Sequence, residues 1–235
     1  IGGNFGCLSG VAPNIDQLMQ LILYRELLEL KFQRKLPMIS AGSSVALPLL
    51  LENQVPRSIN HFRIGESVFL GTDLISGGTL PGLRDDAITL ESEIVEIKEK
   101  SLVPVSDGGV SPFQPIDGGE AAPGERGYRA IVTLGHLDTD VSGLRPLNPN
   151  YQLAGASSDL LVVNLGRNPD GLKLGDSIKF RANYSALLQL MSSKYIDKEV
   201  TPGIDKFNIR PSTGEEDIVP PVVDRYNGAD SPGNK

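Results

Sequence analysis

The chain has 235 residues, of which 40% are hydrophobic and 22% charged, as is ordinary for a globular protein with a sizeable core. Its net charge is −7 and its basic residues are scattered, which argues against a nucleic-acid partner. The longest apolar-rich run, residues 18–30, is interrupted by charged side chains, so we expect no membrane span and no membrane partner. The single cysteine, Cys7, excludes an internal disulfide and favours a reducing, cytoplasmic location.

The chain starts at Ile1 without an initiator methionine, in a glycine-rich run typical of a strand that enters a loop. We therefore expect it to be the downstream part of a longer protein. A helix is predicted over residues 14–35, because Asn14 can cap it and Gln17 can complete a capping box. One broad buried stripe is expected on this helix, formed by Ile15, Leu18, Met19, Ile22, Leu23 and Leu30.

The next segment alternates short strands with helices, which is typical of a parallel α/β layout. A short strand is predicted at residues 38–39, followed by a Gly/Ser turn and a helix over residues 45–52. A second strand is predicted at residues 61–64, followed by Gly65 and a helical turn.

The pattern changes near residue 87, where apolar residues alternate with Glu and Lys in a long half-buried strand at residues 88–97. The alternation slips between Ile94 and Val95, as a β-bulge would cause. Residues 106–127 are rich in Gly and Pro and are predicted to form a long loop. Further elements are expected as strands at residues 129–134, 151–154, 160–165 and 177–182 and as a helix at residues 184–191.

The predicted fold class is therefore α/β plus all-β. A parallel α/β part is expected over residues 1–86 and an antiparallel β domain over residues 87–198. Residues 199–235 are polar, rich in Pro and Gly and without hydrophobic periodicity, so a disordered tail is predicted there.

Two turns in the first part carry residues suited to chemistry. Ser43 and Ser44 follow the first predicted strand; Arg63 lies at the end of the second, and Gly65 follows it. Backbone N–H groups at the start of a helix bind phosphate, hydroxyl groups add donors, and glycine lets the backbone approach closely. We interpret the two turns as a phosphate cradle with an arginine beside it. The alternative is that the turns only cap helices and that Arg63 forms a salt bridge at the strand end.

The stretch ISAGSSVALPLLLENQVPRSINHFRIGESVFLG resembles the closing barrel strands of the fold-type III pyridoxal-phosphate enzymes, the alanine racemase-like proteins. The resemblance is closer to the amino-acid racemase branch that includes ornithine racemase, and it covers about residues 1–198. It implies the closing strands of a (β/α)8 barrel, or TIM barrel, followed by an antiparallel C-terminal β domain. Other stretches that carry it are NFGCLSGVAPN, AITLESEIVEIKEKSLVP, RAIVTLGHLDTDVSGLRPLNPN, LAGASSDLLVVNL and LGDSIKFRANYSALLQLMSSKY.

The resemblance also implies a site for pyridoxal 5'-phosphate. Ser43, Ser44, Gly65 and Glu66 lie where family members bind the cofactor phosphate, and Arg63 lies where an arginine faces the pyridine nitrogen. Because a guanidinium cannot accept a proton, that nitrogen would stay unprotonated and the ring would withdraw electrons less strongly.

Racemisation needs an acid or base on each face of the substrate. In this family one of these two groups is the lysine that holds the cofactor, which lies on the first barrel strand. No lysine of this chain matches it. We therefore expect the isolated chain to be inactive. The other is a tyrosine of the partner subunit in the pattern Gly-Tyr-x-Asp, and here His136 stands in its place. Histidine titrates near neutrality and can move protons. The alternative is that His136 is a loop residue without chemistry.

Three more residues are singled out by the resemblance. Ser158 and Asp159 match a loop that reaches the partner's active site, and are candidates for binding the substrate carboxylate. Tyr195 lies where a tyrosine of the β domain hydrogen-bonds the cofactor phosphate. No metal site is expected, because there are only two histidines and no Cys or carboxylate at ligand spacing from them.

The resemblance therefore implies a pyridoxal-phosphate-dependent racemase of a free amino acid, with ornithine and alanine as candidate substrates and a homodimer as the assembly. Two alternatives stay open. One is other chemistry on the same scaffold, such as a D-amino-acid aldolase, a dehydratase or a decarboxylase. The other is a non-catalytic fragment that binds a phosphate ligand or only dimerises.

Overall fold

The computed structural model of the chain describes residues 1–6, 12–102 and 125–203. By its internal contacts the chain divides into two units, Ile1–Ile196 and Asp197–Lys235, and the helices and strands of the described residues lie in the first. Cys7, most of the predicted loop at residues 106–127 and most of the predicted tail lie outside the described residues.

The first long helix begins as its capping sequence predicts. Helix α1 spans Ile15–Phe32; the Asn14 side chain accepts the N–H of Gln17, and the Gln17 side chain accepts the N–H of Asn14. The helix ends at Gln33, which adopts a left-handed conformation with φ 50°, rather than near residue 35.

The predicted buried stripe on α1 is wrong in its extent. Leu18 and Ile22 are buried, together with Leu21, and pack on the sheet described below. The helix is apolar over a wide arc, and the described part of the chain covers only the side that carries these three residues. The other members of the predicted stripe are exposed, with fractions of 46% for Ile15, 50% for Met19, 52% for Leu23 and 70% for Leu30.

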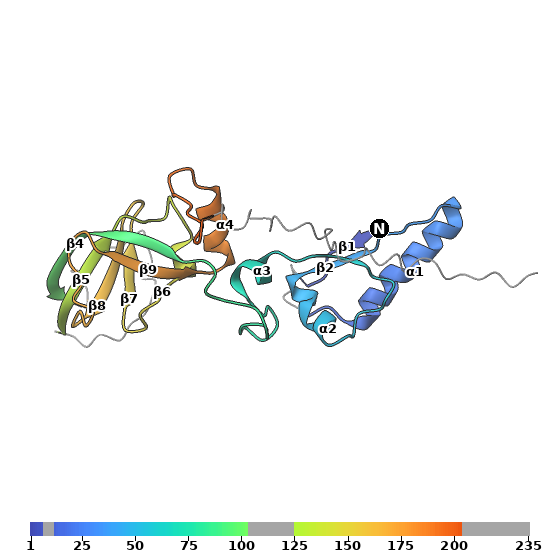
Figure 1. Cartoon of the computed structure of the whole chain (residues 1–235), viewed down its shortest axis with the longest axis horizontal. Coiled ribbons are helices and arrows are strands. Elements are labelled where there is room, and N and C mark those ends of the chain that lie inside the picture. Colours follow the sequence, from blue (N-terminus) through green and yellow to red (C-terminus); the bar gives the residue numbers. More distant parts are fainter. Residues whose placement is uncertain (7–11, 103–124, 204–235) are drawn as a thin grey trace, which may run out of the picture. The chain divides into compact units, whose positions relative to one another are not determined.

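The first sheet is parallel, as predicted, and has the order β1-β2-β3. Figure 1 labels its strands β1 and β2. Its strands are β1 (Gly2–Gly3), β2 (Ser40–Ser43) and β3 (His61–Arg63), so the strand predicted at residues 38–39 lies slightly later in the chain. Ile39, Ala41 and Phe62 contribute to the core on the side of α1. Since side chains alternate along a strand, Ser40, His61 and Arg63 lie on the other face.

Each of the last two parallel strands leads directly into a helical segment. After β2 the chain forms the 3-10 helix Ser44–Ala46 and helix α2 (Leu47–Leu51), in place of the single helix predicted over residues 45–52. After β3 it forms helix α3 (Glu66–Leu70). Strand, turn and helix therefore follow one another twice.

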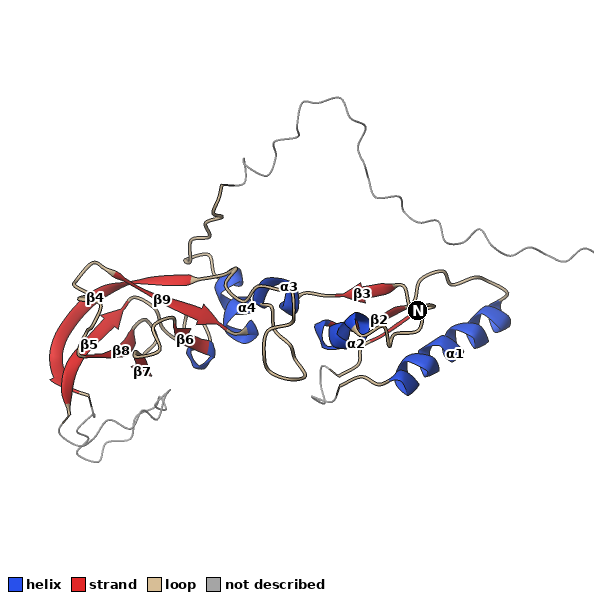
Figure 2. Cartoon of the chain, turned by 60° about the horizontal axis from the view of Figure 1, so that its bottom comes forward, coloured by secondary structure: helices blue, strands red, loops and turns tan. Residues whose placement is uncertain are grey.

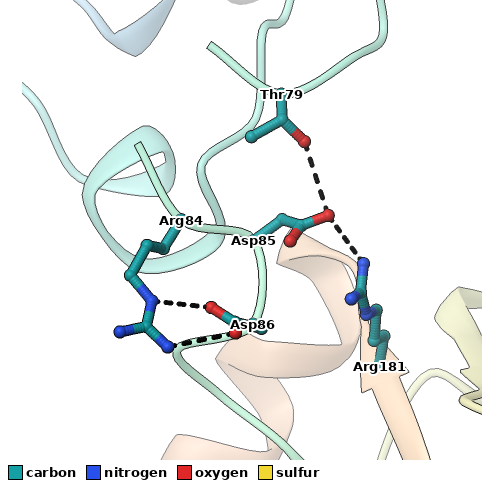
Figure 3. Close-up of polar contacts among 5 residues, drawn as sticks. All are labelled: Thr79, Arg84, Asp85, Asp86 and Arg181. Atoms are coloured by element: carbon teal, nitrogen blue, oxygen red, sulfur yellow. Dashed lines mark hydrogen bonds and ion pairs between the residues drawn. The ribbon is translucent and has the colours of Figure 1, made fainter. Parts of the chain in front are cut away.

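The segment between α3 and the β domain is held by close contacts at both of its ends. At its start, Gly71 has φ 67° and packs so closely that a Cβ would lie 2.6 Å from the Arg84 carbonyl oxygen. At its end, the Asp85 carboxylate accepts the Thr79 hydroxyl at 3.4 Å and the Arg181 guanidinium at 2.6 Å, while Arg84 pairs with Asp86 (Figure 3). The Asp85–Arg181 pair joins this segment to strand β9 (Ser177–Ala182), which belongs to the second sheet described next.

The second sheet is antiparallel and has the order β6-β9-β4-β5-β8-β7 (Figure 2). The predicted bulge is confirmed, since the β4–β5 register shifts between Ile94 and Glu96. The strand β6 was not predicted. The bounds are β4 (Leu90–Ser101), β5 (Arg126–Val132), β6 (Leu144–Pro146), β7 (Gln152–Ala156), β8 (Leu161–Gly166) and β9 (Ser177–Ala182).

The core of the β domain lies on one face of this sheet. Ile94, Val132, Leu153, Val163 and Phe180 are fully buried in it, one from each of five strands. Helix α4 (Tyr184–Ser192) packs against this core and is capped at its start by the Asn183 side chain, which accepts the N–H of Ala186. In the described residues, no helix has the length and apolar character to span a membrane.

A buried tyrosine anchors the loop between β8 and β9. Tyr151 is 6% exposed; its hydroxyl donates to Asp170 Oδ2 at 2.6 Å, and Asn148 Nδ2 donates to the same oxygen at 2.7 Å. These two bonds, that from Tyr151 above all, hold the pKa of the Asp170 carboxyl below its usual range. Burial, with the bond to Asp170, raises the pKa of Tyr151 to about 12.

We expect Tyr151→Phe to lower the free energy of unfolding by about 1 kcal/mol at neutral pH, because one hydrogen bond is lost. Since the pKa of Asp170 is lower in the folded state, this stabilisation is present above the ordinary aspartate pKa of about 3.9 and is lost as the pH falls through the lowered value. The difference in the free energy of unfolding between the unchanged protein and Tyr151→Phe should therefore become smaller at acid pH. Urea unfolding followed by circular dichroism at neutral and acid pH measures it, and an equal penalty at both would contradict the assignment.

Candidate functional site

Arg63 reaches across the polar face of the parallel sheet. It ends β3 and is exposed; its Nη1 donates to the Ser40 hydroxyl on β2, and its Nη2 donates to the Gly3 carbonyl on β1 at 3.2 Å. Both acceptors are neutral, and no salt bridge in the described part of the chain involves Arg63. The alternative prediction, that Arg63 forms a salt bridge at the strand end, is therefore wrong for the described residues.

The two predicted turns are joined by one hydroxyl group. Ser44 Oγ accepts the backbone N–H of Gly65 at 3.3 Å and that of Ser67 at 3.2 Å. Ser44 and Ser67 are both buried, and the Ser67 hydroxyl in turn donates to the Thr72 carbonyl at 2.8 Å. The structure thus brings Ser44 and Gly65 together, beside the strand end that carries Arg63.

Gly42 and Gly65, the glycines of the two turns, differ in whether the protein's own structure requires glycine. Gly42 has φ +94°, and a Cβ there would lie 2.7 Å from the Ala46 Cβ, so the turn itself requires glycine. Gly65 has φ −125°, outside the left-handed region that favours glycine, and a Cβ there would meet no atom within 4 Å. Neither a left-handed conformation nor packing demands glycine at position 65, and the missing side chain leaves space beside the backbone for a ligand.

Ser43 and Glu66 flank this point. Ser43 ends β2, is half-buried, and pairs in register with Arg63. Glu66 is the first residue of α3 and is also half-buried, and desolvation raises the pKa of its carboxyl group. Both residues therefore lie at the same edge of the parallel sheet as Ser44 and Gly65.

His136 lies in a turn that is fastened to a second turn of the β domain. The His136 N–H donates to the Ser157 carbonyl at 3.0 Å, and the Leu137 N–H donates to the Ser158 carbonyl at 2.9 Å. Gly135 is buried between them, and a Cβ there would lie 2.2 Å from the Ser158 carbonyl oxygen. The structure therefore brings the backbone of His136 beside the Ser158-Asp159 pair and leaves the imidazole exposed.

Carboxylates surround this turn. Asp138 Oδ2 accepts the Gly135 N–H at 2.9 Å and so closes the turn. The hydroxyl of Ser142, which donates to Asp140, is the main cause of a lowered pKa of Asp140, and the charge of His136 also contributes. Ser158 Oγ donates to Asp159 Oδ2 at 2.8 Å. Since this hydroxyl is engaged and Asp159 is itself negative, the pair suits an ammonium group better than a carboxylate.

Tyr195 is placed apart from these contacts. It is 80% exposed, and the Lys194 ammonium lies over its ring at 5.1 Å from the centroid. Within the described residues, no hydrogen bond joins its side chain to Ser44, Arg63 or Gly65. No group of three or more His, Cys, Asp or Glu side chains that could hold a metal ion is found among the same residues.

Comparison with known proteins gives two close relatives. The chain is 36% identical over 202 residues to the ornithine racemase of Acetoanaerobium sticklandii, and 34% identical over 206 residues to the lysine racemase of Thermotoga maritima. These matches cover 85% and 87% of the chain. The chain is related to the fold-type III pyridoxal-phosphate racemases. It spans 56% and 57% of the length of these two racemases, so about half of each.

Other comparisons add less. No model of a protein family matches the chain. Among solved structures, it is similar to the alanine racemase of Bartonella henselae with covalently bound pyridoxal phosphate, with a TM-score of 0.49 and 12% identity. That match covers 82% of this chain and 50% of the alanine racemase chain.

Sequence reasoning missed two residues of the site. Ser40 and His61 lie opposite each other in the β2–β3 register; the Ser40 hydroxyl accepts a hydrogen bond from Arg63, and His61 Nδ1 contacts the same hydroxyl. The position of the first strand was predicted too early, at residues 38–39, so Ser40 was assigned to no element. A serine and a histidine at the start of two successive parallel strands were the available signal.

We expect Gly135→Ala to separate the His136 turn from the Ser158 turn, because the new methyl group would collide with backbone atoms that cannot move independently. The free energy of unfolding should fall by about 1–3 kcal/mol, as for other overpacked sites. Gly155→Ala is the matched control, since a Cβ at Gly155 meets nothing within 4 Å. Urea unfolding of both variants measures the effect, and equal stability would show that the two turns are not fastened together.

Proposed function

We propose that the protein to which this chain belongs is a pyridoxal-phosphate-dependent racemase of a free amino acid. The observation that carries the proposal is that the Ser44 hydroxyl connects the turns after β2 and β3 by hydrogen bonds. Arg63, whose hydrogen-bond acceptors are neutral, lies beside these turns, and the chain is a relative of ornithine racemase. On this proposal β1, β2 and β3 are closing strands of a (β/α)8 barrel, and residues 87–198 are the C-terminal β domain.

The residues present fit the cofactor. Gly65 leaves the backbone open at the joined turns, where Ser43, Ser44, Gly65 and Glu66 would hold the phosphate. Arg63 has five N–H donors and no acceptor, so a pyridine nitrogen that faced it would stay unprotonated. Pyridoxal phosphate, when bound, would withdraw electrons from the substrate and so ease removal of its α-proton.

Tyr195 would add a donor to the phosphate. Its side chain is 80% exposed and can be reoriented at little cost. The β domain would thus contribute one phosphate ligand in addition to those from the parallel sheet.

His136 would move a proton on one face of the substrate. An exposed imidazole, on a turn whose backbone is hydrogen-bonded to a second turn, is suited to give and take a proton. In the proposed homodimer it would act in the site of the second subunit, and Ser158 and Asp159 would reach the same place because their turn is fastened to that of His136.

The substrate would be a small or basic amino acid. The two relatives act, by their names, on ornithine and lysine, which carry a second ammonium group. Asp159 would attract such a group, because this residue is exposed and its carboxylate forms no salt bridge among the described residues.

The test is a racemase assay on the protein extended to the full length of its relatives and loaded with pyridoxal phosphate. L-ornithine, L-lysine and L-alanine are each incubated with it, and the enantiomers are separated by chiral chromatography. Formation of the D-enantiomer from one of them is the expected result. Cofactor binding without racemisation would favour other chemistry on the scaffold, and no cofactor binding would overturn the proposal.

We expect Gly65→Ala to weaken the binding of pyridoxal phosphate by about tenfold or more, which corresponds to about 1.4 kcal/mol, because its methyl group would occupy the space beside the backbone N–H groups. The free energy of unfolding without cofactor should stay unchanged, since the Cβ meets no protein atom. Titration with pyridoxal phosphate followed by absorbance measures the affinity. Gly155→Ala, which adds an equally unhindered methyl group in strand β7, is the control and should bind normally.

A further inference from the structure

One hydroxyl group on the polar face of the parallel sheet contacts two side chains. Ser40 Oγ lies 2.8 Å from His61 Nδ1 and accepts a hydrogen bond from Arg63 Nη1. The three residues come from adjacent strands, with Ser40 opposite His61 in the β2–β3 register and Arg63 two residues after His61. Side chains two apart on a strand share a face, so the contact follows from the pairing of the strands.

The proton positions in this trio follow from the chemistry of the groups. A serine hydroxyl has one hydrogen to donate and two lone pairs to accept, and an arginine only donates. Because Arg63 occupies one lone pair of Ser40, the hydroxyl hydrogen of Ser40 is available to His61 Nδ1. In the described residues, no other side-chain or backbone partner of the Ser40 hydroxyl is found, so donation to Nδ1 is the arrangement that satisfies all three groups.

The backbone of β1 makes room for this arrangement. Gly2 is opposite Ser40 in the parallel register, and a Cβ there would lie 3.2 Å from the Ser40 Cβ and 3.1 Å from the Ser40 carbonyl oxygen. Gly3 supplies the carbonyl that accepts the second hydrogen bond of Arg63, at 3.2 Å. The guanidinium is thus held at two points, by a hydroxyl on β2 and by a carbonyl on β1.

We propose that Ser40 and His61 are positioning residues for Arg63: His61 orients the Ser40 hydroxyl, and Ser40 fixes the plane of the guanidinium. This inference rests on the proposed function, in which Arg63 faces the pyridine nitrogen of the cofactor. An exposed arginine has many rotamers, and a planar donor group recognises a ligand only when its plane is set. Neither Ser40 nor His61 touches the cofactor in this scheme, so both act through Arg63.

The first experiment tests the trio without any cofactor. The chain has only two histidines, so nitrogen NMR of the imidazole rings gives two sets of signals, and His136→Gln assigns them. We expect the neutral His61 ring to carry its proton on Nε2 and to accept a hydrogen bond at Nδ1. Ser40→Ala should shift the Nδ1 signal, and Ser40→Thr, which keeps the hydroxyl, should restore it. A proton on Nδ1, or an Nδ1 signal that Ser40→Ala leaves unchanged, would overturn the inference.

The second experiment asks whether the trio acts on the cofactor. In the full-length protein, Ser40→Ala should weaken binding of pyridoxal phosphate about three- to tenfold and change the absorbance spectrum of the bound cofactor, because the group facing its ring nitrogen is no longer fixed. Ser40→Thr should bind as the unchanged protein does. Ser177→Ala is the matched control, a serine-to-alanine change at an exposed strand position.

The two experiments separate the failure of this inference from the failure of the proposed function. If the unchanged protein binds no pyridoxal phosphate, the proposed function fails, and with it the role of the trio toward that cofactor. If it binds the cofactor and Ser40→Ala leaves both affinity and spectrum unchanged, the positioning role is wrong while the proposed function stands.

Discussion

The parallel pairing of β2 with β3 is the constraint on which the candidate cofactor site depends. Parallel strands end at the same edge of a sheet, so residues about twenty positions apart in the chain are brought into contact there. Ser44 can then bond to the turn after β3, and Ser40 can bond to Arg63. The same pairing sends apolar side chains toward α1 and polar ones to the other face, which separates the core from the site.

An equivalent constraint in the β domain comes from the antiparallel pairing of β5 with β8. Val132 at the end of β5 lies opposite Leu161 at the start of β8. The turn that follows β5 and the turn that precedes β8 are therefore neighbours, and these are the turns of His136 and of Ser158. Pairing alone would leave them side by side; the missing side chain of Gly135 lets their backbones bond directly.

Some glycines of the chain are required by its own structure, and Gly65 is not. Gly42 and Gly135 are required by the protein itself, one by a left-handed conformation and the other by contact with backbone atoms. Gly65 is required by neither. A residue whose small size serves no packing or conformational purpose, beside two buried serines and an arginine with neutral partners, is what a ligand-binding turn would need. This contrast gives the phosphate interpretation a physical basis independent of resemblance.

Local signals in the sequence were enough to determine the start of α1, the bulge in β4 and most strands of the β domain, because capping and side-chain alternation depend on neighbours along the chain. The candidate residues Ser43, Ser44, Arg63 and Gly65 were also visible as turns after strands. Periodicity could not show which part of the apolar arc of α1 is covered, and Met19 and Leu30 are exposed as a result. Only the tertiary structure decided that the Ser40 hydroxyl contacts both His61 and Arg63, because such contacts depend on the register between strands, which no local pattern encodes.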